Sequence, residues 1–137
     1  MINRTKEDYL RTIYHLSEEH QKNEVSSVHL CKCLKVSKSS VSEMLRKLIR
    51  DHLVKDFFYG KIKLTAKGKK ESLKVTKKHR IIELFLSEIL RLDQNLIHEE
   101  AHKLEHAFCD ESISKINKLL KNPKSCPHGK PIPKIIK

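Results

Sequence analysis

The sequence has no tryptophan and few aromatic residues, which make up 5% of its 137 positions. Hydrophobic residues of all kinds reach 38%, so we expect a modest core and some apolar surface that is buried between subunits. No apolar run approaches the roughly 20 residues that a membrane span needs. The N-terminus also lacks the hydrophobic stretch of a signal peptide. We therefore expect a cytoplasmic protein with no membrane partner.

The sequence is also poor in cysteine, with only four residues: Cys31, Cys33, Cys109 and Cys126. Four cysteines in a mostly helical chain do not form a typical disulfide framework. Cys31 and Cys33 are two positions apart, so on a helix they point to different sides and do not share a metal. Cys109 is predicted to be a core side chain, with a metal ligand as the alternative.

Positive charge is abundant and unevenly distributed. The formal net charge is +12 and the pI is near 9.6, which favours a polyanionic partner such as nucleic acid. Residues 61–80 are rich in Lys and Arg and contain a single acid, Glu71. Residues 93–110 instead combine acids with histidines. One segment is thus suited to phosphates and the other to cations.

The first 72 residues have the pattern of a winged helix-turn-helix. Apolar spacing predicts a helix over 5–19 with Thr5 as its cap, a short helix capped by Ser26 or Ser27, and a further helix capped by Ser37. Two β-prone runs follow, 53–58 and 61–65, and Tyr59-Gly60 joins them as a hairpin. A helix-turn-helix followed by a basic hairpin is a DNA-binding arrangement.

The DNA contacts are predicted at the start of the helix capped by Ser37, which we call the reading helix, and on the surfaces beside it. Short polar side chains there are suited to base edges or phosphates, whereas basic groups and Ser27 are suited to the backbone. The first group is Ser37, Ser39, Ser40, Ser42 and Glu43, and the second is Ser27, Lys47, Arg50 and Lys61.

The remaining residues, 73–137, are predicted to form a helical domain. Periodicity indicates helices over 66–92, 94–109 and 110–121, with Asp93 as the cap of the second. The last should bury Ile113, Ile116, Leu119 and Leu120. Four prolines between 123 and 133 then end the helical pattern, so the tail is expected to be an extended strap.

Potential metal ligands concentrate in the helix predicted over 94–109. His98, His102, Glu105, His106 and Cys109 share one face, because side chains three and four positions apart converge. Imidazole and carboxylate together suit Mn²⁺, Fe²⁺ or Zn²⁺ better than Ca²⁺ or Mg²⁺.

Other potential ligands lie on either side of this helix. His79 and Glu83 form a convergent pair, and Cys126 and His128 are two residues apart in the strap. Residues 98–102 also match the HExxH pattern of zinc proteases. A hydrolase, a metal-buffering protein and a metal-independent winged-helix regulator of small molecules or proteins are therefore competing hypotheses.

Several segments together resemble the diphtheria toxin repressor / manganese transport regulator family. They are EDYLRTIYHL, VSKSSVSEMLRKLIRDHLV, KLTAKGKK, KHRIIELFL, IHEEAHKLEH and CPHGKPIP, in an order that covers essentially the whole chain. The resemblance implies a mainly α fold, in which a winged helix-turn-helix domain (1–72) precedes a helical metal-binding and dimerisation domain (73–137). An SH3-like domain, which many relatives carry after the strap, is not expected within these residues.

The resemblance also implies two metal sites per subunit. One matches Asp8, His102, Glu105 and His106 and would bridge the domains; the other matches His79, Glu83 and His98, with Cys126 and His128 as additional candidates. Arg11 stands where the manganese-type binuclear site has an acid, which argues against two closely spaced ions. The implied protein is a non-enzymatic, homodimeric repressor of metal-homeostasis genes that binds palindromic operator DNA and is activated by Fe²⁺ or Mn²⁺, with Zn²⁺ as a third candidate.

Overall fold

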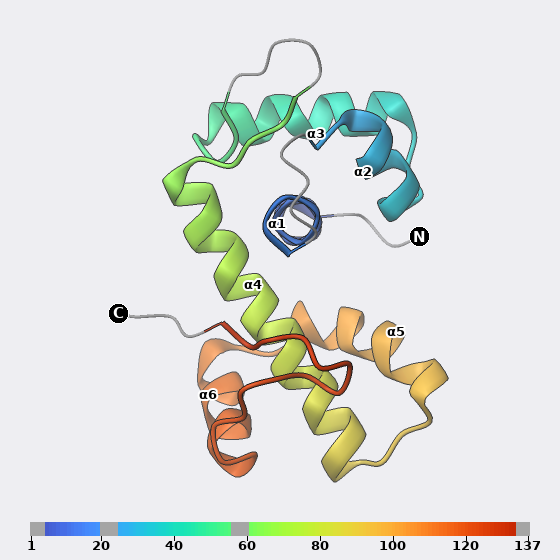
Figure 1. Ribbon diagram of the computed structural model, residues 1–137, viewed down its shortest axis with the longest axis vertical. Helices are drawn as coiled ribbons and strands as arrows, with labels where there is room; N and C mark the ends of the chain where they lie inside the picture. Colours follow the sequence, from blue (N-terminus) through green and yellow to red (C-terminus); the bar gives the residue numbers. More distant parts are fainter. Residues whose placement is uncertain (1–4, 20–24, 56–60, 134–137) are drawn as a thin grey trace. The chain divides into compact units, whose positions relative to one another are not determined.

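The computed structural model describes residues 5–19, 25–55 and 61–133 of the chain. These residues are mainly helical, as predicted, and fall into two compact units, Met1–Leu73 and Lys74–Lys137. Helix α4 (Ala66–Leu84) runs through the boundary between the units (Figure 1).

The first unit begins with helix α1 (Lys6–Tyr14), which starts at a complete capping box. The Thr5 hydroxyl accepts a hydrogen bond from the Asp8 backbone N–H, and the Asp8 carboxylate accepts one from the Thr5 N–H. Both contacts use N–H groups that the first turn of a helix cannot pair internally. The predicted helix continues to residue 19, but its last five residues form the π-helix η1 (His15–Glu19).

Helices α2 (Ser27–Leu34) and α3 (Lys38–Arg50) form the predicted helix-turn-helix (Figure 1). Ser26 is the N-cap of α2, and Lys35 ends that helix in the left-handed conformation with φ of 54°. Ser37 then caps α3 by accepting from the Ser40 N–H. The apolar stripe of α3, Val41, Leu45 and Leu48, is buried in the core of this unit.

The two β-prone runs after α3 pair antiparallel. Val54 and Leu64 form the bridge between them, and Val25, which precedes α2, forms a separate antiparallel bridge with Ile62. The hairpin tip at Tyr59-Gly60 lies outside the described residues. The Thr65 hydroxyl donates to the His52 carbonyl at 2.6 Å and accepts from the Gly68 N–H at 2.9 Å, so it joins the base of the wing to the first turn of α4.

The second unit contains the C-terminal half of α4, the π-helix η2 (Phe85–Ile89), α5 (Gln94–Glu105) and α6 (Asp110–Leu119). The helix predicted over 66–92 ends earlier, because Arg91 adopts a left-handed conformation with φ of 52°. The helix predicted to reach residue 109 also ends earlier, at Glu105. Its N-terminus is as predicted, since Asp93 accepts from the Asn95 N–H.

The described part of the strap, residues 122–133, belongs to the second unit and packs against the helices of that unit (Figure 1). Ile132 is buried in the core of that unit, and the Arg80 guanidinium donates to the Pro131 carbonyl. Ile113 is buried as predicted, but Leu119 is 59% exposed. The prediction that Leu119 is buried is therefore wrong for the single chain, because Leu119 lies on the exposed side of the last turn of α6. No helix among the described residues is long and apolar enough to cross a membrane.

Candidate metal centres and nucleic-acid surface

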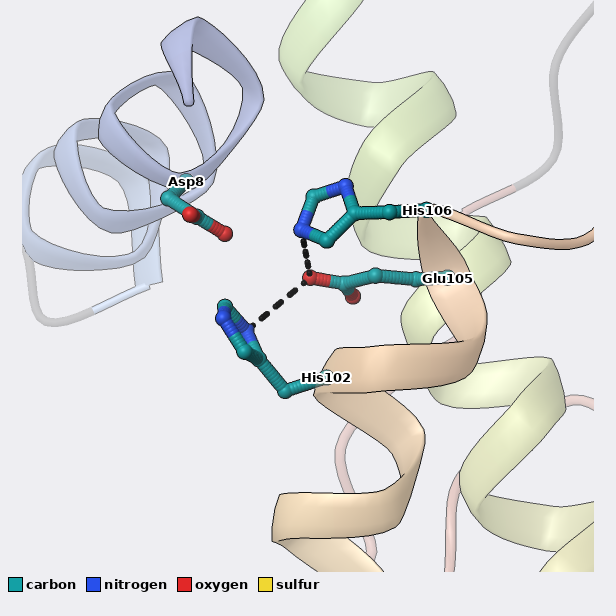
Figure 2. A group of neighbouring side chains, drawn as sticks. All are labelled: Asp8, His102, Glu105 and His106. Atoms are coloured by element: carbon teal, nitrogen blue, oxygen red, sulfur yellow. Dashed lines mark ion pairs between the residues drawn. The ribbon is translucent and has the colours of Figure 1, made fainter. Parts of the chain in front are cut away.

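The first candidate metal centre lies at the C-terminal end of α5. Figure 2 shows His102, Glu105 and His106 projecting from this last turn. The Oε1 atom of Glu105 lies 3.3 Å from His102 Nδ1 and 3.5 Å from His106 Nε2. His102 and Glu105 are buried, whereas the His106 side chain is 28% exposed.

His106 joins this cluster from the C-cap position of α5, where its backbone is still in the right-handed helical region, with φ of −89° and ψ of −14°. One ligand atom from each of His102, Glu105 and His106 lies within 4.8 Å of the others. Two imidazole nitrogens and a carboxylate oxygen form a donor set that fits Mn²⁺, Fe²⁺ or Zn²⁺.

The second candidate centre joins α4 to α5 within the second unit. His79 Nε2 lies 2.9 Å from Glu83 Oε1, one helical turn along α4. The His98 ring of α5 packs edge-on against the His79 ring, with centroids 5.3 Å apart. Ligand atoms of His79, Glu83 and His98 also lie within 4.8 Å of one another. This set again combines imidazole with carboxylate, so it fits the same metals.

The ionisation of Glu83 reflects the histidines around it. Burial alone would raise the pKa of this carboxyl group. The hydrogen bond with His79 and the positive charge available on His79, His128 and His98 outweigh burial and lower its pKa below the usual value. Glu83 is therefore an anionic ligand candidate rather than a neutral buried acid.

The strap brings His128 to the second centre. His128 Nδ1 lies 3.2 Å from Glu83 Oε2, on the oxygen that does not face His79. A turn positions it: the Gly129 N–H donates to the Cys126 carbonyl at 2.9 Å, and Gly129 has φ of 80°. Cys126 itself is buried, and neither ligand cluster found among the described residues includes it.

Asp8, the predicted ligand from the first unit, is a buried residue in the first turn of α1. Its Oδ2 atom accepts from the Thr5 N–H at 3.1 Å, and its own N–H donates to the Thr5 hydroxyl at 3.3 Å. The capping box therefore fixes the orientation of this carboxylate on the helix.

A contact that the sequence did not predict joins the two centres of the second unit. His79 Nδ1 lies 2.6 Å from Glu105 Oε2. His79 thus faces one carboxylate with each ring nitrogen, Glu83 with Nε2 and Glu105 with Nδ1. The two residues are 26 positions apart, so no helical spacing could have indicated this contact.

The geometry separates the histidines of the HExxH pattern. His98 lies with His79 and Glu83, whereas His102 lies with Glu105 and His106. Glu99, which a protease would use as general base, is 66% exposed and 3.6 Å from the Lys103 ammonium. The two histidines therefore belong to different clusters. In a zinc protease, both histidines of this pattern bind the same ion.

The prediction that Cys109 is a core side chain is wrong, because this residue is exposed and is the N-cap of α6. Its Sγ lies 3.3 Å from the Ser112 hydroxyl. Hydrogen bonds from the Ser112 side chain and backbone lower the pKa of the thiol. The early end of α5 moves Cys109 away from the helix face on which it was predicted.

The predicted DNA-contacting residues lie mostly on open surface of the first unit. Ser27 and Ser42 are half-buried, and the others are exposed: Ser37, Ser39, Ser40, Glu43, Lys47, Arg50 and Lys61. Ser37 and Ser40 are joined by a hydroxyl–hydroxyl hydrogen bond of 2.9 Å. Lys47 lies 3.8 Å from Glu43, an exposed pair that contributes little to stability. The exposed N-terminal end of α3 is thus polar and uncovered in the single chain.

The fold defines a winged-helix DNA-binding protein with a second helical domain that carries clustered metal-ligand side chains. Residues 1–60 match the family described as "Iron dependent repressor, N-terminal DNA binding domain". Residues 65–134 match "Iron dependent repressor, metal binding and dimerisation domain". The chain belongs to the iron-dependent repressor family.

Three similar proteins illustrate the extent of the match. An uncharacterized HTH-type transcriptional regulator of Methanocaldococcus jannaschii is 40% identical over 110 residues, which are 80% of this chain and 87% of that protein. The diphtheria toxin repressor of Corynebacterium diphtheriae is 36% identical over 94% of this chain and 56% of its own length. The solved structure of the manganese regulator SloR is 40% identical, with a TM-score of 0.86 over 97% of this chain and 61% of that one. The chain thus spans little more than half the length of the diphtheria toxin repressor.

Proposed function

We propose that this chain is a homodimeric transcriptional repressor that binds palindromic operator DNA when activated by Fe²⁺ or Mn²⁺. The observation that carries the proposal is the pair of histidine–carboxylate clusters in the second unit, on the same chain as a helix-turn-helix. Its metal-homeostasis role is supported by the iron-dependent repressor family and by the likeness to the manganese regulator SloR. Zn²⁺ remains a third candidate because the same donor set suits it.

Two ions per subunit are proposed, one at each cluster. His79, Glu83 and His98 would hold one, with His128 of the strap as a fourth group. His102, Glu105 and His106 would hold the other together with Asp8. The resemblance supports Asp8 as the added ligand, and the capping box holds its carboxylate in one orientation.

The proposed switch follows from the location of these residues in the chain. Asp8 belongs to α1 of the DNA-binding unit, and the other three ligands belong to α5 of the second unit. A bound cation would supply the positive charge that lets carboxylates from both units serve one site. Asp8 and Glu105 would then fix the reading helix of each subunit at the spacing of successive major grooves. His102 and His106 must be neutral to bind, so activation should weaken as pH falls.

The proposed dimer would cover apolar side chains that the single chain leaves exposed. Ile89, Leu90 and Leu96 are 47%, 52% and 49% exposed in the second unit. Large apolar residues left exposed in one unit are consistent with a subunit interface there. The family description of this segment as a dimerisation domain supports the same assignment.

No enzymatic activity is proposed for this chain. The separation of His98 from His102 argues against a shared catalytic ion, and exposed Glu99 is ion-paired with Lys103. Repressor families act by binding DNA and need no catalytic base.

The decisive experiment compares Asp8→Ala and His106→Ala with the wild type in DNA binding. The probe is a duplex selected from a random pool by the Mn²⁺-loaded wild-type protein, and binding is measured anaerobically with Mn²⁺, with Fe²⁺ and with a chelator. Both variants should keep the wild-type circular dichroism spectrum and lose metal-stimulated binding. Asp110→Ala, which removes an exposed acid in the first turn of α6, is the matched control and should respond like the wild type. An equal metal response in all four proteins contradicts the ligand assignment.

A further inference from the structure

The contact between His79 and Glu105 is the feature of the second unit that the two-site proposal does not use. The side chains are 6% and 1% exposed, and Nδ1 lies 2.6 Å from Oε2. The opposite ring nitrogen, Nε2, lies 2.9 Å from Glu83 in the other cluster. One imidazole therefore stands between the carboxylates of both candidate metal centres.

The chemistry of imidazole gives this arrangement a direction. A neutral imidazole that binds a metal through one nitrogen carries its hydrogen on the other. If Nε2 binds the ion of the second centre, Nδ1–H is left to donate to Glu105 Oε2. Such a hydrogen bond fixes the orientation of a carboxylate and of the ring at the same time.

The rest of Glu105 shows what that orientation achieves. With Oε2 engaged by His79, Oε1 faces the other two ligand histidines of its cluster, at 3.3 Å from His102 and 3.5 Å from His106. A carboxylate free to rotate about its last bond would exchange these two oxygens. His79 removes that freedom from a ligand of the first centre although it belongs to the second.

We propose that His79 has two roles: it is a ligand of the second centre through Nε2 and a positioning residue for Glu105 of the first centre through Nδ1. This inference rests on the proposed function, since it requires metal binding at both clusters. It implies that the two centres are energetically coupled, and coupling of this kind acts equally in both directions. An ion at the second centre would hold the hydrogen on Nδ1 and so strengthen the first.

The test uses two ligands of the second centre, of which only one contacts Glu105. Mn²⁺ binding to the full chain is measured by titration calorimetry for the wild type, His98→Ala, His79→Asn and His79→Leu. All three variants should lose the second site. His98→Ala retains the imidazole beside Glu105, whereas His79→Leu removes it. Asn places an amide nitrogen at the same number of bonds from Cα as Nδ1, so it retains a donor to Glu105 without a ligand at Nε2.

We expect the remaining site of His98→Ala and of His79→Asn to bind Mn²⁺ with similar affinity. His79→Leu should bind about 10–100-fold more weakly than His98→Ala, which is the usual effect of removing a hydrogen-bond partner of a metal ligand. If His79→Leu loses its helical circular dichroism signal, His79→Gln replaces it. The Gln amide lies one bond farther out and cannot replace the Nδ1–H donor.

Equal affinities of the first site in His98→Ala and His79→Leu, with two ions bound by the wild type, would overturn the positioning role and leave the proposed function intact. Failure of the wild-type protein to bind Mn²⁺ would overturn both. A weak first site in His79→Asn, matching that of His79→Leu, would also overturn the role assigned to the Nδ1–H donor.

Discussion

Gly68 lies where the first turn of α4 meets the chain just after the reading helix. A Cβ atom built at this position would lie 1.9 Å from the carbonyl oxygen of Leu53 and 2.8 Å from its carbonyl carbon. Both are backbone atoms, so no side-chain rotation can relieve the overlap. Glycine is unfavourable inside a helix by about 1 kcal/mol relative to alanine, and the close approach accounts for its presence here.

Gly68→Ala should therefore destabilise the protein despite its better helix propensity. Steric overlap in a packed region costs about 1–3 kcal/mol, which outweighs the gain in propensity. Urea unfolding measures the change in the free energy of unfolding. Lys70→Ala, at an exposed position of the same helix, is the control and should stay within about 0.5 kcal/mol of the wild type. Equal stability of Gly68→Ala and Lys70→Ala would show that α4 can move away from Leu53.

At the scale of the element, α3 begins at a cap that also faces the proposed DNA surface. Ser37 accepts from the Ser40 N–H at 3.1 Å, and the side chains of Ser39 and Ser40 are exposed beside it. A helix N-terminus with small polar residues is suited to phosphate and base contacts. Two substitutions can separate the capping role from DNA binding.

Ser37→Ala should lower the free energy of unfolding by about 1 kcal/mol, because the cap is lost. Ser37→Asp should retain stability, since Asp caps as well as Ser and its charge is favourable at a helix N-terminus. The same charge should sharply weaken DNA binding through repulsion of phosphates. Chemical denaturation and fluorescence anisotropy measure the two effects. Undiminished DNA binding by Ser37→Asp would show that DNA does not contact this end of α3.

The ends of the second-unit helices show a limit of sequence patterns at this scale. The apolar and polar stripes of residues 94–109 continue at helical spacing to Phe108 and Cys109, so the pattern predicted a helix of that length. The helix ends at Glu105, and the Ala107 N–H donates instead to the Leu104 carbonyl, three residues back, at 3.0 Å. The start was predicted correctly because Asp93 is a local signal, whereas the end has no comparable cap residue.

For the whole molecule, the charge distribution makes a prediction about DNA affinity. The chain carries a net charge of +12, and the residues at the base of the wing and in the first turns of α4 are rich in lysine. Each phosphate contact releases counterions, so the affinity for duplex DNA should fall steeply as salt rises. The measurement is the slope of the logarithm of the association constant against the logarithm of the salt concentration.

Lys61→Ala should reduce the magnitude of that slope by about 1, the contribution of one phosphate contact. Lys115→Ala makes the same change in net charge on α6 of the second unit, where Lys115 lies 3.6 Å from Glu111. This control should leave the slope unchanged. Identical slopes for both variants would mean that net charge, rather than a contact at the wing, determines the salt dependence.

Features that depend on near neighbours could be predicted from the residue pattern alone. Thr5, Ser37 and Asp93 cap helices as predicted, because a cap acts over two or three residues. The helix-turn-helix and the shared face of His102 and Glu105 followed for the same reason, since helical geometry fixes how residues three or four apart converge.

Which histidines share a cluster depends on how the helices pack. His98 and His102 are one helical turn apart, yet the packing of α4 against α5 assigns His98 to His79 and Glu83. The contacts of His79 with Glu105 and of His128 with Glu83 span 26 and 45 residues respectively. Contacts between residues so far apart in the sequence depend on how the buried faces of the helices pack and on where each helix ends. The spacing of residues along the sequence carries no information about either.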